Sequence, residues 1–182
     1  MKFDQFTHKA QEVVAQAQQL ALEKSHQAIE PTHLLLGLLD VDEHLIPRAL
    51  EQQSVNQTTL RNVLDKQLSQ FPKVEGAQVY ASQALNSLFQ KALTISKEMG
   101  DSFVSLEHLF LACISIKDSV ANLLKDAGID PDKTKRIFMD LRKGAKVDSP
   151  AAEQSFDALS KYARHLNQLA ASGKLDPVIG RD

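Results

Sequence analysis

The side chains that could carry out chemistry in this chain of 182 residues are six histidines, one cysteine and several hydroxyl and acidic residues. No second histidine or cysteine stands three or four residues after His8, His26, His44 or His165, so the usual spacing of a zinc site is missing. Cys113 lies in an apolar run, where we expect a small buried side chain rather than a reactive thiol. Metal binding and thiol chemistry are therefore both disfavoured.

Nucleotide chemistry is disfavoured as well. The phosphate-binding pattern GxxxxGK[ST] does not occur in the sequence, and neither do GxGxxG, HExxH, GxSxG or CxxC. We therefore expect no enzyme activity and no cofactor for this chain. An enzyme would need a site built from residues that no motif marks.

Charge and hydropathy narrow the class of protein further. The chain carries 21 basic and 23 acidic residues, a net charge of −2, which removes the broad signature of a nucleic-acid binder. The longest apolar runs, at 34–39 and 109–116, fall far short of the roughly 18–20 residues of a membrane span. The first residues show no apolar signal segment, and the lone cysteine suits a reducing compartment. We expect a cytoplasmic protein without nucleic-acid or membrane partners.

Hydroxyl and acidic residues stand at or near the starts of predicted helices. Thr7 and Ser82 each precede a segment with helical apolar spacing, and Glu107 lies in the first turn after Ser105. Asp101 follows a glycine that ends the preceding helix. Capping and compensation of the helix dipole explain such residues at roughly 0.5–2 kcal/mol each. A binding role is the alternative.

An internal repeat positions these residues. The sequence AIEPTHLLLGLLDV, which begins at Ala28, matches FVSLEHLFLACISI, which begins at Phe103, so the two segments are related by an offset of 75 in residue number. One deletion then changes the offset to 74, so that Val55 aligns with Ile129. Hydrophobic class agrees along more than 50 positions. We predict that the chain contains two copies of one unit.

Two of the histidines are equivalent in this repeat. His33 and His108 are related by the same offset of 75, and each stands at the third position of a predicted helix. A ring nitrogen at that position can close the first helical turn, which we favour over a metal or acid–base role.

Each copy is predicted to form four helices, because apolar residues recur at helical spacing and no segment shows a convincing period of two. We therefore predict an all-α fold of two pseudo-symmetric four-helix repeats, related by a rotation close to twofold and sharing one Leu/Ala-rich core. The first copy has helices at about 7–23, 31–39, 44–52 and 56–70, and the second at about 82–99, 105–115, 119–127 and 132–143.

The composition changes after the second copy. The segment KGAKVDSP reads as a polar linker, and an apolar stripe then predicts one extra helix at about 152–172. Residues 145–182 are expected to contact the core little, and the chain is expected to be a truncated piece. The predicted divisions are 1–143 for the double-repeat domain, with copies at about 1–70 and 76–143, then 144–152 for the linker and 153–182 for the extra helix and its tail.

The repeated motifs IEPTHLLLGLL and VSLEHLFLA resemble the Clp amino-terminal domain. The tail GKLDPVIGRD, which ends the chain, resembles the lead-in to the first AAA+ ATPase module of Clp unfoldases. The resemblance covers essentially the whole chain. It is closest to the ClpB-type disaggregating chaperones because of FPKVEG in the middle loop and ASGKLDPVIGRD at the end.

This resemblance implies a substrate-binding domain of a homohexameric motor that extracts unfolded or aggregated polypeptides together with the DnaK chaperone system. ATP and Mg²⁺ would bind in modules outside this chain, which alone would be monomeric. In that family, substrate engagement is associated with positions that match Thr7, Ser82, Asp101 and Glu107, and Ile95 is the candidate lining residue of a nearby apolar groove. Whether Thr7 and Ser82 serve function or only capping stays open.

Two alternatives stand beside this function. One is an adaptor- and substrate-docking domain of a ClpC- or ClpA-type protease unfoldase, which shares the fold. The other is a free-standing helical enzyme with an unrecognised site. A long coiled-coil insertion in the first downstream ATPase module would indicate a disaggregase, whereas a peptidase-docking loop in the second would indicate a protease partner.

Overall fold

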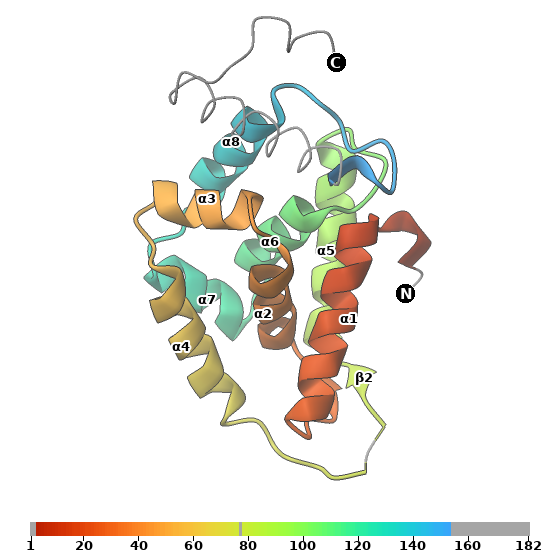
Figure 1. The fold of residues 1–182 in the computed structure, drawn as a ribbon, viewed down its shortest axis with the longest axis vertical. Helices are drawn as coiled ribbons and strands as arrows, with labels where there is room; N and C mark the ends of the chain where they lie inside the picture. Colours follow the sequence, from red (N-terminus) through yellow and green to blue (C-terminus); the bar gives the residue numbers. More distant parts are fainter. Residues whose placement is uncertain (1–2, 77, 154–182) are drawn as a thin grey trace, which may run out of the picture.

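The computed structural model describes residues 3–76 and 78–153, which form eight α-helices after a short 3-10 helix, η1 (Phe3–Gln5) (Figure 1). The predicted all-α fold is confirmed; the extra helix and the tail predicted for 153–182 lie almost wholly outside the described residues. The first copy contains α1 (His8–Glu23), α2 (Pro31–Val41), α3 (Leu45–Gln52) and α4 (Gln57–Leu68), and the second α5 (Gln83–Glu98), α6 (Leu106–Ser115), α7 (Ser119–Asp126) and α8 (Pro131–Arg142).

The helix boundaries repeat with the predicted offsets. Both ends of α5 are related to those of α1 by the offset of 75, and both ends of α7 and α8 are related to those of α3 and α4 by the offset of 74. The one-residue deletion therefore falls at the end of α6. Backbone conformation repeats too, because Ser25 and Ser54 have positive φ angles of 59° and 58° where the second copy has Gly100 and Gly128.

Exchanged backbone pairings join the two copies. Strand β1 (Ala28–Ile29) lies parallel to β2 (Tyr80–Ala81) with Ile29 opposite Ala81, and Phe6 forms a parallel bridge with Val104. Under the offset of 75, Ala81 is the equivalent of Phe6, and Val104 is the equivalent of Ile29. Phe6 therefore pairs with the counterpart of Ile29, and Ile29 pairs with the counterpart of Phe6. A twofold axis that relates the two copies produces such an exchange.

This axis runs across the long helices, so that α1 and α5 point in opposite directions. Figure 1 shows α1 beginning at the top beside η1, whereas α5 begins at the bottom beside β2. Thr7 and Ser82, which start these helices, therefore lie at opposite ends of the molecule. The two caps therefore do not approach one face of the domain.

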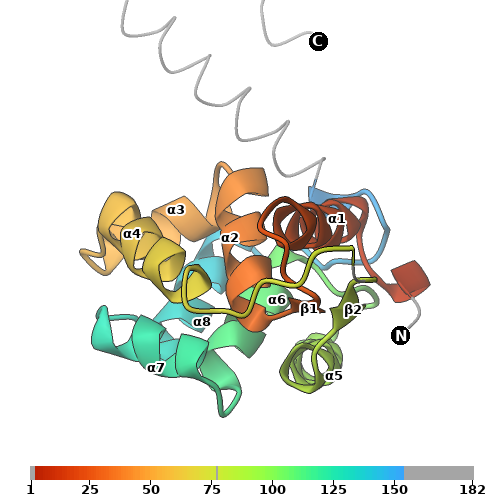
Figure 2. The same cartoon turned by 90° about the horizontal axis from the view of Figure 1, so that it is seen from below.

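One hydrophobic core spans both copies, as predicted. Helices α2 and α6 occupy its centre (Figure 2), and nearly every residue of both is buried, which matches their all-round apolar sequences. Gly37 lets α1 approach α2, because a Cβ there would lie 2.9 Å from the carbonyl oxygen of Val13. Within the described part of the chain, no helix is long and apolar enough to cross a membrane.

Residues 145–153, which we call the strap, contact both copies. Val147 is fully buried, and its carbonyl oxygen accepts a 2.9 Å hydrogen bond from Ser102 N–H. The carbonyl oxygen of Pro150 accepts a 2.8 Å bond from His8 N–H at the start of α1. The expectation that this region contacts the core little is therefore wrong for 145–153, because its polar groups satisfy N–H groups at helix starts. The other predicted boundaries stay predictions.

Replacement of Ser54 by glycine tests the shared backbone plan. Ser54→Gly is expected to raise the free energy of unfolding by about 0.5–1 kcal/mol, because a left-handed conformation is strained for serine and free for glycine. Ser69→Gly is the control, since Ser69 has an ordinary φ of −64°. Urea unfolding measures both; a loss of stability in Ser54→Gly as large as in the control would contradict the prediction.

Candidate functional site

Thr7 and Ser82 cap their helices with the same geometry. Both have φ −64° and ψ 163°, and their side-chain oxygens accept hydrogen bonds from Ala10 N–H at 3.1 Å and Leu85 N–H at 3.0 Å. The predicted capping is confirmed. Thr7 is fully buried and Ser82 is only 9% exposed, so capping occupies side chains that lie beneath the surface. A role in substrate binding stays a prediction for both.

His33 and His108 close the first turns of α2 and α6, as predicted. The backbone N–H of Glu30 donates to His33 Nδ1 at 2.8 Å, and that of Ser105 donates to His108 Nδ1 at 2.8 Å. Because Nδ1 accepts in each ring, the proton of a neutral ring sits on Nε2 and is free to be donated onward.

The onward partner differs between the copies. His33 Nε2 lies 2.9 Å from Nδ1 of His26, whereas His108 Nε2 lies 2.7 Å from Oδ2 of Asp101, which is the equivalent of His26. Burial, and then the neighbouring ring, lower the pKa of His33 to about 4, and the Phe71 ring packs against both imidazoles. The first copy therefore holds a neutral pair where the second holds a carboxylate.

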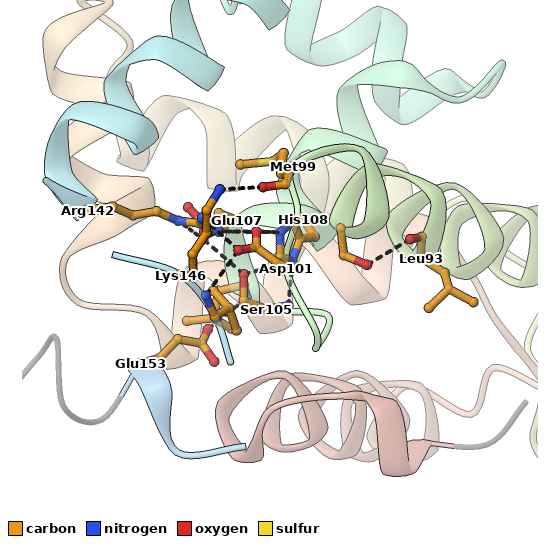
Figure 3. A network of polar contacts seen from close by, with 12 residues as sticks. Leu93, Met99, Asp101, Ser105, Glu107, His108, Arg142, Lys146 and Glu153 are labelled. Carbon is orange, nitrogen blue, oxygen red and sulfur yellow. Dashed lines mark hydrogen bonds and ion pairs between the residues drawn. The ribbon is translucent and has the colours of Figure 1, made fainter. Parts of the chain in front are cut away.

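Asp101, Glu107, His108 and Arg142 form a buried polar network that we call the Arg142 cluster (Figure 3). The guanidinium donates to both Asp101 oxygens, with Nη1–Oδ1 at 3.0 Å and Nη2–Oδ2 at 2.7 Å. Its Nε donates to Glu107 Oε1 at 2.6 Å, and Nη2 also contacts that oxygen. Such bidentate charged bonds are strong and fix the orientation of both partners.

The electrostatics of the cluster favour a charged Asp101. Burial raises the pKa of this carboxyl, but hydrogen bonds from His108, Arg142 and the N–H of Val147 outweigh burial and hold the pKa well below its ordinary value. For Arg142, burial lowers the pKa, and the bonds to Asp101 and Glu107 more than compensate. The guanidinium thus stays charged between two acidic side chains.

A metal ion does not suit this cluster. One ligand atom each from Asp101, Glu107 and His108 lie within 4.8 Å of one another, which is a spacing that a cation could use. The Arg142 guanidinium, however, already contacts both carboxyl groups and supplies the positive charge. The arrangement can therefore hold structure in place, with the guanidinium in the position that a cation would take.

The cluster continues into the strap. Asp101 Oδ1 accepts a 3.0 Å bond from Val147 N–H, and Lys146 Nζ donates to the carbonyl oxygen of Met99 at 2.8 Å (Figure 3). Glu153 Oε2 accepts a 2.7 Å bond from Leu106 N–H, the first residue of α6. The cluster therefore ties the end of α8, the start of α6 and the strap together.

The structure brings some of the predicted site residues together and separates others. Asp101 and Glu107 share Arg142, whereas Thr7 donates its hydroxyl to Glu153, whose carboxyl also accepts from Leu106 N–H next to Glu107. Ser82 lies at the opposite end, and Ile95 is 8% exposed within the core. The substrate-binding role predicted for these residues stays a prediction.

Sequence reasoning missed Arg142 and Glu153. Arg142 follows the buried residue Phe138 by one helical turn and takes the place of Leu68 in the first copy. A charged residue on an apolar stripe was thus the available signal that a buried partner exists. No comparable signal pointed to Glu153, which lies beyond the repeat.

Comparisons with known proteins agree with this fold. Residues 5–127 match the family model described as Clp repeat (R) N-terminal domain. The chain is 45% identical over 182 residues to Chaperone protein ClpB of Bacteroides thetaiotaomicron, and 39% identical over 185 aligned residues to that of Rickettsia felis. It is covered completely in both, but spans only 21% and 22% of these relatives, about a fifth of their length.

Solved structures show the same fold at lower identity. The N-terminal domain of Hsp104 from Candida albicans matches with a TM-score of 0.72 and 21% identity, covering 82% of this chain and 99% of that one. The N-terminal domain of the ClpV1 ATPase from E. coli matches with a TM-score of 0.68 and 18% identity, covering 81% and 91%.

Removal of the central cation tests the Arg142 cluster. Arg142→Met is expected to lower the free energy of unfolding by about 3–5 kcal/mol, because two buried acidic side chains lose their partner. Arg136→Met, exposed on the same helix, is the control and should cost less than about 0.5 kcal/mol. Equal losses in chemical denaturation would show that the cluster contributes nothing specific.

Glu153 should make stability depend on pH. Burial raises its pKa from 4.5 to about 7, although the Thr7 hydroxyl and Leu106 N–H oppose the rise. The folded state then holds this proton more tightly than the unfolded state, so stability falls as pH rises from about 4.5 to 7. Glu153→Gln should match the original chain at pH 5 and exceed its unfolding free energy by roughly 1–3 kcal/mol at pH 8.

The measurement compares the two proteins at each pH. His33 acts in the opposite direction, since its lowered pKa removes stability as pH falls from 6.5 toward 4. This contribution is common to both proteins and cancels in the difference. A difference that does not change between pH 5 and pH 8 would contradict the prediction.

Proposed function

The chain belongs to the Clp repeat (R) N-terminal domain family, and from this premise we propose that it is the substrate-binding domain of a ClpB-like, ATP-dependent protein disaggregase. The observation that carries the proposal is the 45% identity, along all 182 residues, to a protein named Chaperone protein ClpB. The domain would capture unfolded or aggregated polypeptides and present them to the motor.

The remaining parts of the machine would lie outside this chain. The chain spans about a fifth of its ClpB relatives and carries no phosphate-binding loop, so ATP and Mg²⁺ would bind elsewhere in the whole protein. We propose a cytoplasmic homohexamer that works with the DnaK chaperone system, whereas the 182-residue chain alone is monomeric. The relatives compared above are named ClpB, which favours a disaggregase over a protease unfoldase.

Exposed apolar side chains support capture of unfolded polypeptides. Leu22, Val63 and Tyr80 are 50%, 44% and 55% exposed and belong to the six large apolar side chains that are exposed in the described residues. Apolar burial is nondirectional, so such residues can bind many unrelated segments. Affinity should be weak, with a Kd of about 10–1000 μM, because an unfolded client loses conformational entropy when it binds.

Titration with an unfolded client tests this function. We expect the chain to bind reduced, carboxymethylated lactalbumin, which cannot fold, with a Kd of about 10–1000 μM by fluorescence anisotropy. The native, disulfide-intact form of the same protein is the control and should bind at least tenfold more weakly. Equal affinity for both forms, or no binding to the unfolded form at 1 mM, would contradict the proposal.

A further inference from the structure

A groove of about 650 Å³ lies between α4 and α7, and we call it the α4–α7 groove. Its floor and walls are largely apolar, with Val63 44% exposed. Figures 1 and 2 both show these two helices side by side at the edge of the domain. Its 14 lining residues include Val55, Val63 and Lys66 on the α4 side and Leu123, Asp126 and Ala127 on the α7 side.

The repeat relates the pair α4 and α7 to the pair α8 and α3, which we call the closed pair. Helices α3 and α8 are the counterparts of α7 and α4, and they pack against each other, whereas α4 and α7 do not pack closely. The side-chain amide of Gln53 bridges the closed pair. Its Oε1 accepts from Asp130 N–H at 2.9 Å, and its Nε2 donates to Thr134 Oγ1 at 2.8 Å.

The groove lacks this bridge because its residues have diverged. Ala127 stands where the closed pair has Gln53, and its methyl group cannot span the gap between the helices. Leu60, which is buried, replaces Thr134, so the hydroxyl that the amide contacts in the closed pair is missing here. One side chain present in the closed pair is thus missing, and apolar surface is left uncovered in its place.

Both ends of the groove are defined. At one end Gln67 Nε2 donates to Ser119 Oγ at 2.6 Å, and at the other Val55 lies close to Gly128, where a Cβ would meet Val55 Cγ2 at 3.8 Å. The part of α4 between these ends, from Gln57 to Gln67, is about 15 Å long at 1.5 Å per residue, which is the span of about five extended residues.

The two ends of the groove carry side chains of opposite charge. Lys66 lies beside Gln67 at the first end, and Asp126 lies next to Ala127 at the second. An extended segment with an acidic side chain at one end, a basic side chain at the other and aliphatic residues between them complements both charges. The 14 lining residues are fewer than the roughly 20–30 per side of a stable protein–protein interface, which argues for a short segment and against a second copy of the chain.

We propose that the α4–α7 groove binds such a segment of an unfolded polypeptide, with its aliphatic side chains against Val63 and Leu123. This rests on the proposed function and assigns it a site that is separate from the Arg142 cluster. The occupant takes the space that Gln53 fills in the related helix pair.

Filling the groove is the sharpest test. The probe is a terminally blocked peptide, Glu-Leu-Val-Leu-Lys, titrated into the ¹⁵N-labelled 182-residue chain. Ala127→Gln restores the missing amide and should weaken peptide binding at least fivefold. Thr58→Gln is the matched control, since Thr58 is exposed on the same α4 helix but outside the groove, and its Kd should change less than twofold.

Further variants keep the test decisive. Val63→Ser, at an exposed position, should weaken binding at least threefold without disturbing the fold. The peptide Glu-Ser-Thr-Ser-Lys should bind at least tenfold more weakly than the aliphatic peptide. Unchanged affinity in both Ala127→Gln and Val63→Ser, or shifts confined to the starts of α1, α5 and α6, would overturn the proposal.

Failure of the groove proposal can be distinguished from failure of the proposed function. If the chain binds the unfolded client but the resonances of α4 and α7 do not shift, the groove proposal fails and the proposed function stands. If the peptide binds in the groove but the chain does not distinguish unfolded from native client, the proposed function fails and the groove stands.

Discussion

The exchanged pairing of Phe6 with Val104 and of Ile29 with Ala81 is the constraint on which the rest of this domain depends. Each copy of the repeat supplies one partner to each pairing, so neither copy can complete its own polar backbone contacts. The exchange places α2 and α6 next to each other at the centre, where nearly every residue is buried. Two units that would be too small alone therefore share one core.

Within this shared frame the copies have diverged in two places. In the first place, Asp101 lies before α6 where the first copy has His26, and Arg142 ends α8 where the first copy has Leu68. A charged cluster therefore replaces a neutral one. A buried ion network is costly to desolvate and adds little net stability, but it fixes geometry. Here it holds the strap against α6 through Val147. Between α4 and α7, loss of the amide equivalent to Gln53 leaves a groove instead.

The helices and the repeat could be predicted because they depend on local spacing. Capping by Thr7 and Ser82 and turn closure by His33 involve residues within a few positions of one another. The offsets of 75 and 74 follow because the same local pattern of apolar residues occurs twice. The Arg142 cluster could not be predicted, because Arg142 meets Asp101 from 41 residues away. Deep burial of the acidic residues also escaped, since charged side chains at helix starts are usually solvated.

The central claim is that divergence between two related helix pairs left one of them open to an unfolded segment. Intermolecular nuclear Overhauser effects between the leucine methyl groups of the bound Glu-Leu-Val-Leu-Lys peptide and the methyl groups of the chain test it most directly. The account predicts contacts to Val63 and Leu123, on the two walls of the groove. Contacts to residues around the starts of α1 and α6, with none to Val63 or Leu123, would contradict it.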